Sequence, residues 1–157
     1  MRLTDFIPRK AILPSLKAAN KKAVITELVT ALRKAADGEK FAVVEVAEAV
    51  LDREKIGSTG LGAGVAVPHA KIESLKGVLG AFGRCAGGVD FNSVDGEPVS
   101  LVFLIVAPPQ KNEEYLQALQ KTMRAIKQPN VCKFLRAAKT AKEIEDLFRE
   151  TEEVAKV

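Results

Sequence analysis

The sequence predicts an α/β fold in which a central mixed β-sheet is flanked by helices on both faces. Residues 99–106 are rich in Val, Leu, Ile and Phe and show no alternation of polarity, which is typical of a central strand covered on both faces. Segments with helical periodicity stand before and after the strands, so helices are available for each face. The hydrophobic content of 47% supplies a real core, and residues 1–157 fit a single domain.

Two helices are predicted ahead of the strands. Residues 23–36 repeat apolar side chains at helical spacing, with Asn20 as the N-cap and Gly38 as the stop. Residues 41–53 carry a second apolar set of the same kind, which ends near Gly57. Both helices therefore have a stripe that can pack on the sheet.

The middle of the chain predicts three strands, over residues 65–67, 78–85 and 99–106. Gly87-Gly88 and Asp95-Gly96 mark turns between the second and the third.

Helices return after the last strand. Residues 112–127 form one apolar stripe, and residues 131–135 indicate a short helix. Residues 140–143, Thr-Ala-Lys-Glu, have the pattern of a capping box that opens the last helix. These helices complete the second face of the sheet.

Composition and charge exclude several classes of protein. The net charge is +4, but the two signs are interspersed and aromatic residues are sparse, so we expect no nucleic-acid binding. The longest apolar run, residues 101–107, is too short to span a membrane, and the N-terminus lacks the apolar region of a signal peptide. We therefore expect a cytoplasmic protein without membrane insertion, whose mildly basic surface would suit an acidic protein partner.

No metal site or cofactor is expected. Cys85 and Cys132 form no CxxC pair, and with one histidine they cannot supply four zinc ligands. Whether the two cysteines lie close together is left open. The glycine-rich residues 60–64 lack the strand before and the helix after that a dinucleotide fingerprint requires, and no serine or cysteine sits in a nucleophile elbow.

His69 is the only histidine of the chain. A glycine-rich segment leads through a short apolar run to Pro68, and the histidine follows. An isolated histidine is usually an ordinary surface or core residue, but one chemistry needs a single imidazole and little else: carrying a phosphoryl group. Such transfer depends on a nearby cation and hydrogen-bond donors, for which Arg53, Ser58, Thr59 and the glycine amides are the local candidates.

The surrounding pattern is specific. Arg53-Glu54, followed by Ser58-Thr59-Gly60-Leu61-Gly62 and then by residues 64–69, resembles the signature of the type-2 IIA domain of the phosphoenolpyruvate-dependent phosphotransferase system. This is the fructose, mannitol and nitrogen-regulatory branch. The resemblance extends over nearly the whole chain, from residues 3–6 to the helix that begins at residue 112, and it implies the fold of that family.

The resemblance also implies roles for individual residues. His69 would be phosphorylated, through Nε2, by a phosphohistidine on a small HPr-like phosphocarrier protein, with no metal and no cofactor. Arg53 would neutralise charge near the phosphoryl group, although it has a plainer interpretation as a solvated cation at a helix end. The other residues that would line the site are Ser58, Thr59, Gly60 and Pro68.

Tyr115 departs from the family pattern. Many members have a second histidine at the start of the helix after the central strand, in a motif like His-Leu-x-x-Leu, and this chain has Tyr115 in its place. A phenol can donate a hydrogen bond but is not a cation at neutral pH. Tyr115 could orient the imidazole or meet a phosphoryl oxygen, or it could be a partly buried residue at the edge of the helix stripe.

Three functions follow from this reading. The chain shows no IIB or transmembrane IIC segment and looks most like the stand-alone nitrogen-regulatory IIA proteins, whose phosphorylation state controls partner proteins. A sugar-specific IIA of the fructose or mannitol kind would instead relay phosphate to a separate IIB protein. The third candidate function is that of a binding module that no longer takes phosphate. The presence of both Arg53 and His69 disfavours it.

Overall fold

The computed structural model describes residues 1–155, with side chains through residue 152. Its helices are α1 (Leu3–Phe6), α2 (Lys21–Ala35), α3 (Val43–Ile56), α4 (Asn112–Lys127), α5 (Val131–Ala137) and α6 (Ala141–Ala155). Its strands are β1 (Ile12–Leu13), β2 (Gly60–Gly62), β3 (Val65–Ala66), β4 (His69–Lys71), β5 (Leu79–Val89) and β6 (Val99–Ala107). Two short 3-10 turns, η1 (Arg9–Ala11) and η2 (Pro109–Lys111), precede β1 and α4.

The sheet is mixed, as predicted. Its order is β1-β5-β6-β3-β2, and β4 pairs with β6 beyond the end of β3. Strands β5 and β6 are antiparallel, with Phe82 opposite Phe103, whereas β3 and β4 both run parallel to β6. Because β3 and β4 follow each other along the same neighbour, they form one strand that is interrupted at Val67 and Pro68.

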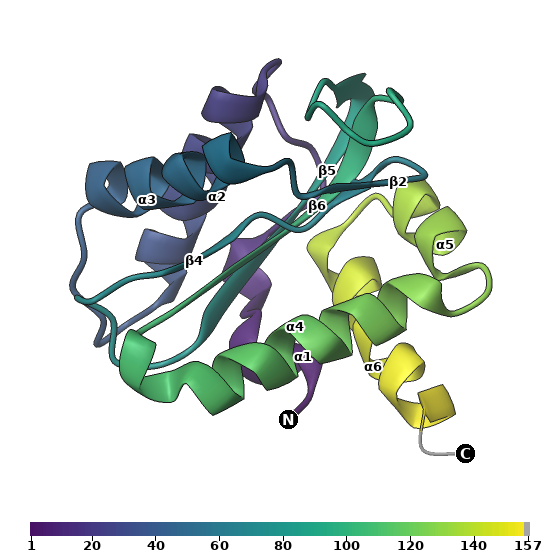
Figure 1. The fold of residues 1–157 in the computed structure, drawn as a ribbon. Helices are drawn as coiled ribbons and strands as arrows, with labels where there is room; N and C mark the ends of the chain where they lie inside the picture. The colour runs from purple at the N-terminus through teal and green to yellow at the C-terminus, as the bar shows by residue number, and fades with distance from the viewer. Residues whose placement is uncertain (156–157) are drawn as a thin grey trace.

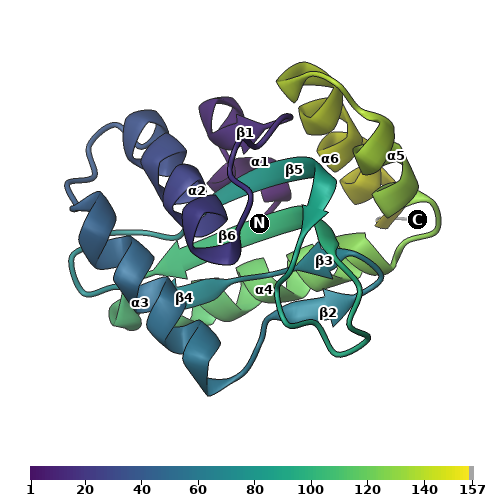
Figure 2. The same cartoon turned by 90° about the horizontal axis from the view of Figure 1, so that it is seen from above.

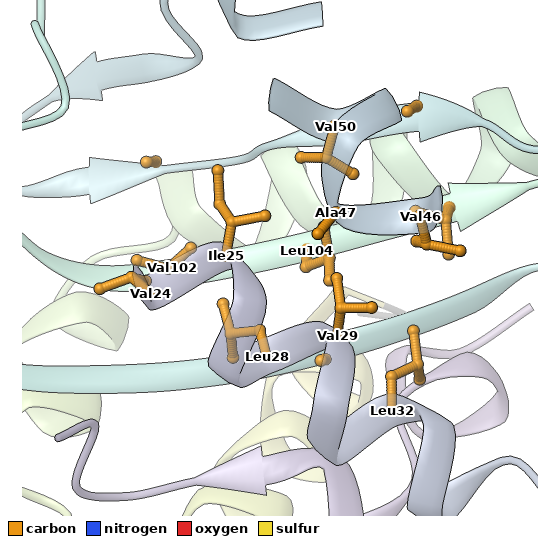
Figure 3. Packing of buried hydrophobic residues seen from close by; sticks show 14 of the residues in the cluster. Val24, Ile25, Leu28, Val29, Leu32, Val46, Ala47, Val50, Val102 and Leu104 are labelled. Carbon is orange, nitrogen blue, oxygen red and sulfur yellow. The ribbon is translucent and has the colours of Figure 1, made fainter. Parts of the chain in front are cut away.

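Helices cover both faces of this sheet, which confirms the predicted layering. Helices α2 and α3 lie on one face, and α1, α4, α5 and α6 lie on the other (Figure 1; Figure 2 shows the same arrangement from above). Each face has its own hydrophobic cluster, and Figure 3 shows the side chains of α2 and α3 packing on Val102 and Leu104 of β6.

Strand β6 is buried on both of its faces, which explains why its sequence shows no alternation of polarity. Leu101, Phe103 and Ile105 belong to the cluster under α4 to α6, while Val102 and Leu104 belong to the cluster under α2 and α3. All of these side chains are almost completely buried. Each contributes about 1.5–3 kcal/mol of burial free energy, so β6 is the central support of both layers.

The predicted helix ends are confirmed where a side chain caps them. The backbone N–H of Ala23 donates to Oδ1 of Asn20 at 2.9 Å, so Asn20 is the N-cap of α2. The backbone N–H of Glu143 donates to Oγ1 of Thr140 at 3.1 Å, which opens α6 as the capping pattern indicated. Helix α3 begins and ends a few residues later than predicted and reaches Ile56.

Two sequence predictions are wrong in detail. The Gly87-Gly88 turn does not form, because β5 continues to Val89 through an irregularity in its pairing with β6. Gly88 has a φ of +73°, and a Cβ there would lie 2.9 Å from Cβ of Pro98, so the glycine serves a bulge and a close approach rather than a turn. The predicted strand over residues 65–67 stops at Ala66.

The two cysteines are free and lie on opposite faces of the sheet. Cys85 is buried in the cluster under α2 and α3, and Cys132 packs against the other cluster. Among the described residues, no helix has the length and apolar character needed to cross a membrane.

Candidate functional site

The backbone of His69 is fixed to the most buried strand of the protein. His69 is the first residue of β4 and lies opposite Ile105 of β6, and the N–H of Ile105 donates to the carbonyl of Pro68 at 3.0 Å. Pro68 lacks an N–H and interrupts the strand immediately before the histidine. The imidazole that follows is half-buried.

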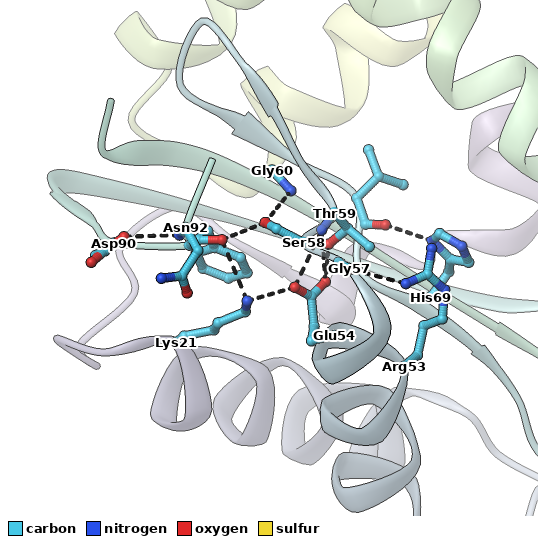
Figure 4. Close-up of polar contacts among 12 residues, drawn as sticks. Lys21, Arg53, Glu54, Gly57, Ser58, Thr59, Gly60, His69, Asp90 and Asn92 are labelled. Atoms are coloured by element: carbon cyan, nitrogen blue, oxygen red, sulfur yellow. Dashed lines mark hydrogen bonds and ion pairs between the residues drawn. The ribbon is translucent and has the colours of Figure 1, made fainter. Parts of the chain in front are cut away.

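The ring of His69 is held in one orientation by its own backbone. Nδ1 lies 2.7 Å from the carbonyl oxygen of Val67 (Figure 4). A carbonyl oxygen only accepts hydrogen bonds, so Nδ1 carries the proton and Nε2 of the neutral ring keeps its lone pair. The ring nitrogen with an available lone pair is therefore Nε2.

Tyr115 stands beside this imidazole. It lies in the first turn of α4, its side chain is only 6% exposed, and its ring centroid is 6.1 Å from that of His69, at an interplanar angle of 55°. Burial raises the pKa of Tyr115 to about 12, although the cation of Arg53 opposes that rise. Tyr115 is therefore a neutral phenol at physiological pH.

Arg53 reaches the same place from the last turns of α3, which packs against β4. Its Nη1 donates to the carbonyl of Gly57 at 2.9 Å, and within the described residues this is the one hydrogen bond that the guanidinium makes. Figure 4 shows the guanidinium directed toward His69. The influence of Arg53 on the pKa of Tyr115 agrees with that position.

Ser58, Thr59 and Gly60 are used differently from what the sequence suggested. The hydroxyl of Ser58 donates to the carbonyl of Phe91, and the N–H of Gly60 donates to Oγ of Ser58 at 3.0 Å. The hydroxyl and the N–H of Thr59 both donate to the carboxylate of Glu54. These groups therefore fix the loop between α3 and β2, and they are occupied by partners within the protein.

Glu54 is the centre of a buried polar cluster that the sequence did not predict. Its side chain is almost fully buried. Its Oε2 lies 2.6 Å from Nζ of Lys21, which is in the first turn of α2. The ammonium of Lys21 also lies 5.4 Å from the centroid of the Phe91 ring. The cluster ties α2, α3 and the loop together, and the pairing of Lys21 with Glu54 is too distant in sequence for any local pattern to reveal it.

Lys71 also lies near Tyr115, and the sequence did not predict it there. It follows His69 by two positions on β4, and its Nζ lies 5.8 Å from the centroid of the Tyr115 ring. Residues two apart on a strand share a face, so the spacing alone could have placed it beside His69.

The arrangement suits attack on an anionic electrophile. An imidazole with an available Nε2 stands beside a guanidinium, an ammonium and a neutral phenol. Through residue 152, no group of three His, Cys, Asp or Glu side chains is placed to hold a metal ion.

Comparisons with known proteins agree with this picture. Residues 5–151 match the family model described as "Phosphoenolpyruvate-dependent sugar phosphotransferase system, EIIA 2". The chain is 40% identical over 144 residues to a nitrogen regulatory protein of Bradyrhizobium diazoefficiens, and the match covers 92% of each chain.

Solved structures give the same result. The crystal structure of nitrogen regulatory protein IIA-Ntr from Neisseria meningitidis is similar with a TM-score of 0.85 and 31% identity, over 93% of this chain and 98% of that one. The complex of enzyme IIA-mannitol and phosphorylated enzyme IIB-mannitol from Escherichia coli matches with a TM-score of 0.74 and 26% identity, over 90% of this chain and 95% of that one.

Proposed function

The chain belongs to the type-2 EIIA family of the phosphoenolpyruvate-dependent phosphotransferase system, and on that premise we propose that it carries a phosphoryl group on His69. The observation that carries the proposal is the hydrogen bond from Nδ1 to the carbonyl of Val67. It leaves the Nε2 lone pair available and fixes the direction in which that lone pair points.

The donor is a phosphohistidine on an HPr-like carrier protein. In the transfer step, the Nε2 lone pair of His69 forms a bond to phosphorus while the bond from phosphorus to the donor nitrogen breaks. The electron pair of the broken bond stays on the donor imidazole, and Nδ1 of His69 keeps its proton. The carbonyl of Val67 stabilises the positive charge that develops on the ring.

Arg53 neutralises charge during this step. The transferring phosphoryl group carries negative charge on its equatorial oxygens, and a guanidinium can meet two of them at once. One N–H of Arg53 donates to the carbonyl of Gly57 and so orients the side chain, while its other N–H groups remain available for the phosphoryl group. The phenol of Tyr115 borders the same space as a neutral group.

The phosphorylation state of His69 then regulates partner proteins. Phosphorylation adds about 1.5 to 2 negative charges to a half-buried imidazole, by analogy with phosphate esters, which is a large local change that a partner can sense. This choice is supported by the nitrogen regulatory relative, which matches 92% of both chains, and by the similar IIA-Ntr structure.

A second candidate is a step in sugar transport. The similar structure of IIA-mannitol is a complex with phosphorylated IIB-mannitol, so the same fold also supports contact with a IIB protein. In that case His69 would pass its phosphoryl group to a separate IIB protein of the fructose or mannitol kind.

The test is reconstitution with phosphoenolpyruvate, enzyme I and HPr. The wild-type protein is expected to gain one acid-labile phosphoryl group, measured by intact-protein mass spectrometry, and His69→Ala to gain none. Thermal melting of His69→Ala checks that the loss is chemical and not caused by unfolding. An unlabelled wild-type protein would contradict the carrier function and favour a binding module.

Adding IIB proteins to the labelled protein separates the two candidates. Retention of the label in the presence of fructose- and mannitol-type IIB proteins supports the regulatory function. Rapid transfer to one of them would make the transport function the correct one.

A further inference from the structure

Tyr115 has two neighbours on the same strand. His69 and Lys71 both approach its ring, with the imidazole centroid at 6.1 Å and the ammonium nitrogen at 5.8 Å from the ring centroid. Ala70, between them, is buried in the cluster on the opposite face of the sheet. The alternation along β4 therefore presents the imidazole and the ammonium on one face, and α4 supplies the aromatic ring that they share.

The ring of Tyr115 is a rigid support. It is almost fully buried and packs in the cluster that also contains Ile105 and Ala107, the two residues of β6 that lie opposite His69 and Lys71. Lys71, by contrast, has an exposed side chain. A cation over an aromatic face is attracted by the negative face of the ring, which favours one position of a flexible lysine.

No carboxylate competes for this ammonium in the described part of the chain, where every ion pair involves other residues. Residues two apart on a strand are separated by about 6.6 Å, a distance that a lysine side chain spans. Lys71 can therefore contact a group bound to Nε2 of His69 without any movement of the backbone.

We propose that Lys71 is a second cation for the phosphoryl group on His69, and that the ring of Tyr115 holds it there. Arg53 approaches the phosphoryl group from α3 and Lys71 approaches from β4, so the two positive charges lie on different elements. The inference rests on the proposed phosphorylation of His69 and adds a positioning role for Tyr115 that depends on its aromatic face rather than on its hydroxyl.

The experiment measures the rate of phosphoryl transfer from phosphorylated HPr to the full chain. Lys71→Gln is expected to lower kcat about tenfold with little change in the KM for phosphorylated HPr, and Lys71→Arg to recover most of the rate. Lys76→Gln removes the same charge from an exposed position five residues along the chain and is the matched control.

The tyrosine variants test how Lys71 is held. Tyr115→Phe keeps the aromatic face and is expected to lose about twofold, whereas Tyr115→Leu is expected to lose about tenfold. Lys71→Gln combined with Tyr115→Leu should be no slower than Lys71→Gln alone, because both changes remove the same interaction.

Three outcomes would overturn the inference. If the wild-type protein is labelled and Lys71→Gln is as fast as Lys76→Gln, Lys71 does not act at the phosphoryl group, although the carrier function stands. If Tyr115→Phe is as slow as Tyr115→Leu, the hydroxyl matters and the ring does not hold Lys71. If the wild-type protein is never labelled, the carrier function and this inference fail together.

Discussion

Arg53 and Glu54 are neighbours in the sequence, yet they belong to two clusters of opposite character. Glu54 points toward Lys21, and its carboxylate also accepts from Thr59, so the charges of this buried cluster are matched (Figure 4). Arg53 points toward His69. In the described structure, Nε2 of His69, the remaining N–H groups of the guanidinium and the ammonium of Lys71 have no hydrogen-bond or ion-pair partner. The buried cluster of Glu54, Lys21 and Thr59 holds the loop in place. The open cluster, which consists of His69, Arg53, Lys71 and Tyr115, is available for a ligand.

The comparison predicts that the two clusters fail differently. Glu54→Ala removes the carboxylate that pairs with the ammonium of Lys21 and accepts from the N–H of Thr59, which should lower the free energy of unfolding by about 3–5 kcal/mol. Urea denaturation measures the change. Glu48→Ala, an exposed position on the same helix, is the control and should change stability by less than about 0.5 kcal/mol. Equal stability of the two variants would show that the buried cluster does not support the fold.

Arg53→Ala should have the converse effect. Loss of the guanidinium is expected to slow phosphorylation of His69 about a hundredfold, because a charge-stabilising donor is removed from the transfer step. The free energy of unfolding should change by less than about 0.5 kcal/mol. Lys34→Ala, an exposed cation on α2, controls for the change in net charge. Full-rate labelling of Arg53→Ala would remove Arg53 from the site.

Tyr115 offers a pH test of the open cluster. Its pKa is raised to about 12 in the folded protein by burial, against about 10 in the unfolded chain, so the folded state retains the phenolic proton more strongly. The resulting stability, about 3 kcal/mol, is fully present below pH 10 and is lost as the pH rises from 10 to 12. Because Tyr115 is the only tyrosine and tryptophan is absent, ultraviolet absorbance follows its ionisation directly.

Tyr115→Phe is the control for that titration. It should remove this part of the alkaline loss of stability and leave the loss that arises from other groups. An ordinary pKa for Tyr115 in the folded protein would mean that the phenol is solvated and that the ring is less firmly packed than described.

Ser58→Ala should have the smallest effect. It removes the hydroxyl that donates to the carbonyl of Phe91 and accepts from Gly60, at a cost of about 1 kcal/mol in the free energy of unfolding. The phosphorylation rate should stay within about twofold. Ser74→Ala, an exposed serine, is the comparison for stability. A large loss of phosphorylation rate with unchanged stability would show that Ser58 acts at the phosphoryl site rather than in the support of the loop.

The fold was predictable where one local signal decided each element. Asn20 caps α2 as expected, and the lack of alternating polarity along β6 indicated burial on both faces. The short strands β1, β2 and β4 are not predicted, because two or three residues carry no measurable periodicity. Gly87-Gly88 predicts a turn because a bulge uses the same residue.

The site was predictable to a different extent. The sequence pattern and the family resemblance predict His69, Arg53 and Tyr115 as site residues, and the structure brings these three side chains to one place. The pairing of Lys21 with Glu54 was not predictable, since it joins two helices across 33 positions of the sequence and depends on how those helices pack. Lys71 was within reach of the spacing rule for strands but shows its relation to Tyr115 only in three dimensions.

The short outer strands have a consequence for recognition. In the described chain, β1 has two residues and β2 has three, and Pro68 interrupts the strand that bears His69. Edges this short offer too few main-chain groups to template an added strand from another molecule. Strands β1 and β2 therefore give a partner almost no backbone ladder to extend, and we expect recognition at His69 to depend on the side chains displayed around its imidazole.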